Sequence, residues 1–254
     1  MGAAVLIVTV VAVVAVVVAE GLLVLVRRRV PVEVLAENND AVGITFATLG
    51  VLYAVMLAFG LIATWERFEE SRGLVLTEAA ALDDLAELSV AFGPAPRAEI
   101  TTALQNYVDA VRTDEWASMA AGNGGAATAE EALGELWAVY LDDRFVFDNE
   151  AAYDHSLDAL ARTDDARQDR LSDADSTMSR FMLFVIFAGA VPSALFPLAL
   201  GVTNARLHAV ALGGLVAATA LLVTATYLMS NPFSGPLAVP VSPFTEVAES
   251  LGGG

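Results

Sequence analysis

The sequence lacks two residue types entirely. None of its 254 residues is cysteine, and all 13 basic residues are arginine, because lysine is absent as well. Without cysteine there can be no disulfide, no thiolate chemistry and no zinc–thiolate site. The sequence also contains no phosphate loop, nucleophile elbow, metalloprotease motif or dinucleotide fingerprint. We therefore expect a protein that is not an enzyme and that needs no cofactor or metal.

Charge is distributed unevenly along the chain. The 31 acidic and 13 basic residues give a net charge of −18. Residues 66–180 contain 25 of the acids and nine of the arginines, so this segment alone has a net charge of −16. Such a surface repels nucleic acid and anionic lipid and attracts cations. A GC-rich genome or a salty habitat would also produce an acidic surface without lysine, so the charge by itself assigns no partner.

Apolar residues are more abundant than in most globular proteins. They make up 56% of the chain, and the mean hydropathy is +0.61. A transmembrane helix needs about 20 predominantly apolar residues. Four segments meet this requirement, at residues 3–26, 41–65, 181–201 and 208–229. The sequence thus predicts an all-α, polytopic membrane protein, with four transmembrane helices in two hairpins and a water-facing helical domain between the second and third.

These segments divide the chain into four predicted parts. They are a first transmembrane hairpin (1–65), an acidic helical soluble domain (66–180), a second transmembrane hairpin (181–229) and a Pro/Gly-rich C-terminal tail (230–254). Inside the domain, apolar residues recur at helical spacing, with breaks at 93–96 and 122–125 and further helices predicted at 128–146 and 150–180. In the tail, Pro240 and Pro243 predict that the final residues are not helical.

The arginines do not decide which side of the membrane holds the domain. The short loops contain four, in the triplet at 27–29 and at Arg206. The flanks of the domain contain five, at Arg67, Arg72, Arg167, Arg170 and Arg180. Cytoplasmic loops carry an excess of arginine and lysine, but four against five is no excess.

Several polar residues have two interpretations. Glu20 would be an ion ligand inside the membrane or a residue at its interface. The polar residues 38–40 would form a vestibule or a solvated turn. The carboxylate pairs of the domain read as solvated surface, since they lack histidine and the spacing of a calcium loop; they are Asp83-Asp84, Glu130-Glu131, Asp142-Asp143 and Asp164-Asp165. His155 reads as surface and His208 as interfacial.

Two segments carry a resemblance to bestrophin channels. Residues 49–55, Leu-Gly-Val-Leu-Tyr-Ala-Val, lead into Thr-Trp-Glu-Arg-Phe-Glu-Glu-Ser-Arg-Gly-Leu-Val at 64–75. This pattern resembles the second bestrophin helix and its cytosolic extension. After the fourth span, Asn-Pro-Phe-Ser-Gly at 231–235 is similar to the bestrophin Asn-Pro-Phe-Gly turn. The order of elements agrees along almost the whole chain.

More specifically, the chain resembles the bacterial bestrophin-like family. The residues that match its landmarks are Tyr53, Trp65, Glu78, Ala79, Tyr107, Glu115, Trp116, Arg167, Arg170, Asn231, Pro232 and Phe233. The resemblance implies a homo-oligomer, a pentamer by analogy, that conducts small monovalent ions across the cell membrane and has its domain in the cytosol. The acidic cluster of calcium-regulated bestrophins is missing after the turn, where Pro-Leu-Ala-Val-Pro follows at 236–240, so no calcium clasp is implied.

If the resemblance holds, the second span lines the pore. Residues four apart share a helix face, which gives two candidate stripes: Thr48, Leu52 and Met56, or Leu49, Tyr53 and Leu57. Ordinary helix packing or lipid contact would use the same apolar residues. In the domain, Tyr107 and Glu115-Trp116 indicate a core or an interface. The alternative function is a non-conducting membrane scaffold or sensor whose acidic domain binds a partner.

Overall fold

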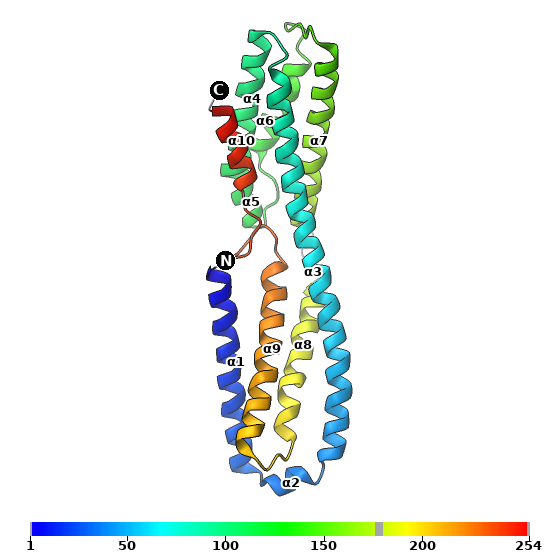
Figure 1. The fold of residues 1–254 in the computed structure, drawn as a ribbon, viewed down its shortest axis with the longest axis vertical. Coiled ribbons are helices and arrows are strands. Elements are labelled where there is room, and N and C mark those ends of the chain that lie inside the picture. Colours follow the sequence, from blue (N-terminus) through cyan, green and yellow to red (C-terminus); the bar gives the residue numbers. More distant parts are fainter. Residues whose placement is uncertain (1, 176–179, 253–254) are drawn as a thin grey trace. The chain divides into compact units, whose positions relative to one another are not determined.

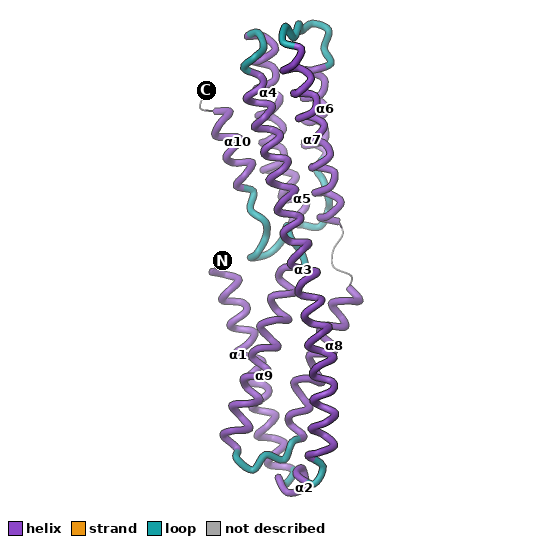
Figure 2. Tube along the Cα trace, turned by 45° about the vertical axis from the view of Figure 1, so that its right-hand side comes forward, coloured by secondary structure: helices purple, strands orange, loops and turns teal. Residues whose placement is uncertain are grey.

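The computed structural model describes residues 2–175 and 180–252. These residues form helices and connecting loops, and no strand occurs among them (Figure 2). The elements are α1 (Gly2–Arg29), α2 (Val32–Ala36), α3 (Asn39–Ser89), α4 (Pro94–Ala110), the π-helical turn η1 (Val111–Glu115), α5 (Trp116–Ala120), α6 (Ala127–Tyr140), α7 (Glu150–Asp175), α8 (Arg180–Leu195), the 3-10 turn η2 (Phe196–Ala199), α9 (Ala205–Met229) and α10 (Ser242–Gly252).

Four helical segments are long and apolar enough to cross a membrane. They are α1, α3, the segment Phe181–Ala199 formed by α8 and η2, and α9. The predicted all-helical membrane protein with four candidate spans is confirmed. Pro31 follows α1, and Pro197 lies where α8 gives way to η2, because proline cannot continue the hydrogen-bond ladder. At the start of α9 the Asn204 side chain accepts hydrogen bonds from the amides of Arg206 and Leu207, both at 3.1 Å.

The chain divides into two compact units. Met1–Glu66 and Met178–Ser230 form the first, which we call the membrane unit, and Arg67–Thr177 and Asn231–Gly254 form the second, the domain unit. In the membrane unit α1 packs against α9 and α9 against α8 (Figure 1). The contact between α1 and α9 buries Leu23, Leu212 and Val216.

Two glycines of the membrane unit allow close contacts. A Cβ atom at Gly189 of α8 would overlap the ring of Tyr53 on α3, so the missing side chain makes room for the ring. A Cβ atom at Gly201 would overlap the backbone of α2 at Ala36. Asn39, at the start of α3, holds the same loop, since its Nδ2 donates to the Gly201 carbonyl (3.3 Å) and its Oδ1 accepts from the Gly201 amide (2.8 Å). Asn39 and Asp40 belong to α3, so they do not form the solvated turn that was one of their two interpretations.

The domain unit has an apolar core of buried side chains. Helix α6 packs against α4, and the described residues with no exposed surface include Leu82, Leu104, Leu136 and Leu160 from four different helices. Buried apolar residues recur at helical spacing within each segment, for example Ile100, Leu104 and Tyr107 in α4, which is why the sequence predicted the helices. The helix predicted at 128–146 ends earlier, at Tyr140. The helix predicted at 150–180 is described to Asp175, and residues 176–179 lie outside the described part.

One prediction about the tail was wrong. Residues after Pro240 form α10, although the two prolines were expected to prevent a helix. Pro243 occupies the first turn of α10, where a proline disrupts no intrahelical hydrogen bond. Phe244 and Val247, three residues apart, are buried by the rest of the domain unit. Packing of one apolar face thus stabilises this short helix.

Candidate functional site

The membrane half of α3 has one exposed and one packed face. Thr48, Leu52 and Met56 are all exposed, with fractional exposures of 59% for Leu52 and 47% for Met56. Leu49, in the other predicted stripe, is also exposed, at 40%. Apolar side chains without a partner in a membrane helix face lipid, another subunit or a pore.

The remaining two predicted residues contact α8. Leu57 is buried in a small apolar cluster with Ile186 and Val223. The Tyr53 hydroxyl donates a hydrogen bond to the Ile186 carbonyl at 3.1 Å, and its ring lies over Gly189. Both side chains therefore make their contacts within their own chain.

The domain unit contains a cluster of buried charged residues centred on Arg170. Its Nε atom lies 2.7 Å from Glu78 Oε2, and its Nη2 atom lies 3.0 Å from Glu78 Oε1 and 2.8 Å from Glu115 Oε1. All three side chains have no exposed surface. The third nitrogen, Nη1, contacts the Met119 sulfur at 3.2 Å. Every nitrogen of this guanidinium therefore has a partner, as a buried arginine requires.

Arg167, one helical turn earlier on α7, completes the charge balance. Its Nη2 atom lies 2.7 Å from Glu115 Oε2 and its Nη1 atom 2.7 Å from Glu130 Oε2. Glu115 also accepts a hydrogen bond from the Ala126 amide at 3.2 Å. Two arginines thus face two fully buried glutamates and one exposed glutamate, Glu130. The cluster links α3, η1, α6 and α7 through paired charges.

Aromatic side chains enclose the cluster. The Tyr107 hydroxyl donates to Glu78 Oε1 at 2.7 Å. The rings of Trp116 and Phe244 each lie 5.7 Å from the Arg170 guanidinium carbon, a favourable cation–π distance. Phe233, from the Asn-Pro-Phe turn, packs edge-on against Trp116 at 5.7 Å. The tail therefore contributes two of the aromatic rings of the domain core.

Burial and pairing shift the pKa values of the cluster. Burial alone would raise the pKa of Glu115, but hydrogen bonds from Arg167 and the charge of Arg170 hold it below its ordinary value. Burial and the neighbouring Glu78 charge raise the pKa of Tyr107 well above its ordinary value. Burial would lower the pKa of Arg170, yet Glu78 and Glu115 keep it above its usual range. At neutral pH Glu115 and Arg170 are therefore ionised, and Tyr107 is a neutral hydrogen-bond donor.

The structure brings together seven of the predicted landmarks: Glu78, Tyr107, Glu115, Arg167 and Arg170 in the cluster, and Trp116 and Phe233 among the aromatic rings around it. Tyr107 and Glu115 were expected in a core or an interface, and both are fully buried. The sequence did not indicate that α7, which reads as polar and solvated, buries Arg167 and Arg170. It also missed Met119 and Phe244. Besides the family resemblance, the spacing of three residues between the two arginines was an available signal, since residues at i and i+3 share a helix face.

The remaining landmarks take no part in the ion pairs of this cluster. Trp65, near the end of the membrane unit, is 55% exposed, as an interfacial tryptophan would be. Ala79 is buried beside Glu78. In the turn at Asn231, the Ser234 amide donates to the Asn231 carbonyl (3.2 Å) and the Val239 amide to the Pro232 carbonyl (2.7 Å).

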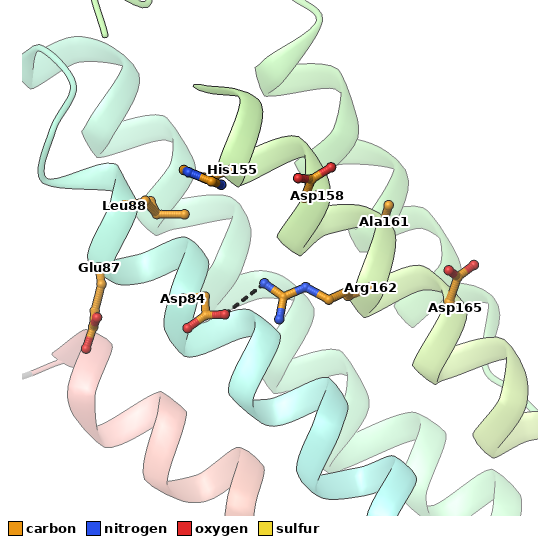
Figure 3. A pocket seen from close by; sticks show the side chains of 8 residues that line it. All are labelled: Asp84, Glu87, Leu88, His155, Asp158, Ala161, Arg162 and Asp165. Atoms are coloured by element: carbon orange, nitrogen blue, oxygen red, sulfur yellow. Dashed lines mark hydrogen bonds and ion pairs between the residues drawn. The ribbon is translucent and has the colours of Figure 1, made fainter. Parts of the chain in front are cut away.

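A groove on the domain unit lies between α3 and α7 (Figure 3). It has a volume of about 850 Å³. Four of its eight lining residues are acidic; the lining consists of Asp84, Glu87, Leu88, His155, Asp158, Ala161, Arg162 and Asp165. Arg162 reaches across to Asp84 at 2.8 Å. Within the described residues no group of three His, Cys, Asp or Glu side chains is arranged to hold a metal ion.

The polar residues predicted near the membrane interfaces each contact another part of the membrane unit. Glu20 of α1 faces α9, where its Oε1 atom would lie 3.4 Å from a Cβ atom at Gly213. His208 is buried, and its Nε2 atom lies 2.9 Å from the Pro197 carbonyl. The Arg27 guanidinium donates a hydrogen bond to the Val202 carbonyl, and so joins α1 to the loop before α9.

The four apolar helices and the separate buried core of the domain unit define an all-helical membrane protein. Residues 13–244 match the Bestrophin-like domain family. The chain belongs to this family, which confirms the resemblance drawn from the sequence.

Solved structures share the fold. One variant of a bacterial bestrophin homologue from Klebsiella pneumoniae is similar with a TM-score of 0.72 and 15% sequence identity, over 93% of this chain and 98% of that one. A second variant of the Klebsiella homologue matches with a TM-score of 0.71 and 15% identity, over 92% and 97%. No curated protein is significantly similar.

Proposed function

We propose that the chain forms a homo-oligomeric ion channel, a pentamer by analogy, in which α3 of each subunit lines the pore. Membership of the Bestrophin-like family carries this proposal. The exposed side chains on the membrane half of α3 support it, because a pore needs a helix face that its own subunit leaves uncovered.

We assign the pore-facing stripe to Thr48, Leu52 and Met56. All three are exposed, whereas Tyr53 and Leu57 of the other stripe are occupied by α8. Rings of Leu52 and Met56 from several subunits would form an apolar constriction, which can gate an ion path by excluding water. Leu49, which is exposed beside this stripe, would face a neighbouring subunit.

Monovalent cations are the favoured ions in this proposal. The domain segment 66–180 has a net charge of −16. If its surface lines the conduction path, it raises the local concentration of cations and lowers that of anions. The same charge makes nucleic acid an unfavourable partner.

The topology that we propose is multi-pass. Residues 1–65 and 181–229 form two transmembrane hairpins in the cell membrane, residues 66–180 form the cytosolic domain, and residues 230–254 form a tail. Sidedness is testable by single cysteines at Asn123 and Glu37, both exposed. Because the chain has no native cysteine, an impermeant maleimide applied to whole cells should label Glu37→Cys. Labelling of Asn123→Cys instead would place the domain outside.

Ion flux tests the function directly. Purified protein in liposomes should release sodium faster than chloride, with protein-free liposomes as the control. Flux of neither ion would contradict the channel, and faster chloride flux would contradict only the selectivity. The mass of the detergent-solubilised protein is a second test, since a monomer or dimer cannot build a central pore from one helix per subunit.

A further inference from the structure

A narrow apolar groove runs along the outside of the membrane unit. It is lined by α1, α8, η2 and α9, has a volume of about 240 Å³, and lies within the membrane-spanning segments. Its lining contains only aliphatic side chains, namely Ala15, Val18, Ala19, Leu22, Val191, Ala194, Leu195, Leu198 and Val216. Pockets for drug-sized ligands have volumes of roughly 300–1,000 Å³ and contain some polar groups. This smaller and wholly apolar groove suits a hydrocarbon chain.

An arginine lies in line with the groove at the end of α1. Ala15, Leu22 and Arg29 are spaced seven residues apart, so they share one helix face. Arg29 is about 10 Å beyond Leu22 along the helix axis. Helical side chains lean toward the N-terminus of their helix, and Arg29 therefore leans toward the groove.

Arg29 is also available for a ligand. It is exposed and makes no hydrogen bond or ion pair with a described residue. Arg28, its neighbour, is equally exposed but projects from the helix about 100° away. The two residues therefore have the same charge and nearly the same depth but different positions relative to the groove.

We propose that this groove binds an anionic phospholipid, with one acyl chain between α1 and α8 and the phosphate held by Arg29. A groove that opens inside a bilayer is surrounded by acyl chains, and the arginine at its end adds charge complementarity for an anionic headgroup. A guanidinium can form two parallel hydrogen bonds with a phosphate. The site does not depend on ion conduction, so it can exist whether or not the chain is a channel.

Native mass spectrometry of the full-length protein in detergent tests the site. The probes are phosphatidylglycerol and phosphatidylcholine with identical acyl chains, titrated separately. We expect wild type to bind phosphatidylglycerol more tightly. The Arg29→Gln variant should bind it roughly fivefold more weakly, the effect of about one basic residue near an anionic headgroup. The Arg28→Gln variant is the matched control and should retain most of the affinity.

A second pair of variants tests the acyl-chain groove. Ala194→Leu fills the groove from α8 and should weaken both lipids alike. Val18→Phe fills it from the exposed side of α1 and replaces Ala194→Leu if that variant is less stable than wild type in a thermal unfolding assay.

Three outcomes would overturn the proposal. Equal losses in the Arg28 and Arg29 variants would mean diffuse attraction to the arginine triplet. Unchanged binding after the groove is filled would mean that the lipid lies elsewhere. Binding of neither lipid by wild type would mean that another element, such as a helix of a second copy, occupies the groove. None of these outcomes affects the flux test of the channel.

Discussion

The membrane unit and the domain unit place their apolar and charged residues in opposite ways. In the membrane unit Val5, Leu6 and Val17 of α1 are more than 60% exposed, since lipid is their solvent. In the domain unit Leu82 and Leu104 have no exposed surface, and most acidic residues face water. Yet the domain unit also buries Glu78, Glu115 and Arg170. In the membrane unit the arginine triplet 27–29 and Arg206 lie at helix ends.

This difference shows what each unit depends on. The membrane unit needs length and apolarity, together with close contacts such as that of Tyr53 with Gly189. The domain unit depends on a complete set of ionic partners, because each buried charge is costly without its counter-charge. Substitution of one ionic partner should therefore destabilise the domain unit much more than loss of one hydrogen bond destabilises the membrane unit.

The largest effect is expected for Arg170→Ala. The substitution leaves Glu78 buried without its counter-charge and removes one of the two arginine partners of Glu115, which costs about 3–5 kcal/mol. Chemical denaturation of the full-length protein in mild detergent, followed by tryptophan fluorescence, measures the change. The matched control is Arg162→Ala, which breaks the exposed pair with Asp84 and should cost at most about 1 kcal/mol. Equal losses in both variants would contradict the importance of the buried cluster.

Phe244→Ala should have the next largest effect. The ring is fully buried against Trp116 and Arg170, and removal of a buried phenylalanine typically costs about 3–5 kcal/mol. We expect the lower end of this range, because α10 lies near the chain end and can adjust. Glu249→Ala, on the exposed face of the same helix, is the control for helix formation. A Phe244→Ala protein as stable as Glu249→Ala would mean that α10 does not belong to the core.

Glu115→Gln should alter the pH dependence of stability. The folded state lowers the pKa of Glu115 below its ordinary value of 4.5. Its stabilising contribution is therefore complete above pH 4.5 and is lost as the pH falls through the lower folded value. At pH 7 the variant should be about 2 kcal/mol less stable than wild type. Below pH 4.5 the gap should narrow.

Unfolding midpoints measured from pH 7 to pH 3 test this prediction. Glu131→Gln, an exposed position on α6, is the control and should follow the wild-type curve closely. A gap between wild type and Glu115→Gln that stays constant over the whole range would show that folding does not lower the pKa of Glu115.

The smallest effect is expected in the membrane unit. Tyr53→Phe removes only the hydrogen bond to the Ile186 carbonyl and leaves the ring over Gly189. Its loss should cost about 1 kcal/mol. Thermal unfolding in detergent measures the change. A loss as large as that of Arg170→Ala would remove the contrast between the two units.

The sequence predicted the four spans because each combines length with apolarity, two properties of a single segment. The membrane core around Leu57 and the domain core around Tyr107 are harder to predict from the sequence, since they depend on which helices pack together. The buried cluster shows this limit most clearly: Arg170 pairs with Glu78, which lies 92 residues earlier in the chain. The π-helical turn that ends at Glu115 and the helix formed after Pro240 also depend on such packing.

The most direct test of the proposed channel is thiol block of single-cysteine variants during sodium flux. Leu52→Cys lies on the exposed stripe of α3, and Leu57→Cys lies in the contact with α8. The native chain has no cysteine, so wild type provides an unreactive control. The proposed pore predicts that a charged thiol reagent alters flux through Leu52→Cys and leaves Leu57→Cys and wild type unchanged. Modification of Leu52→Cys without any change in sodium flux would contradict it.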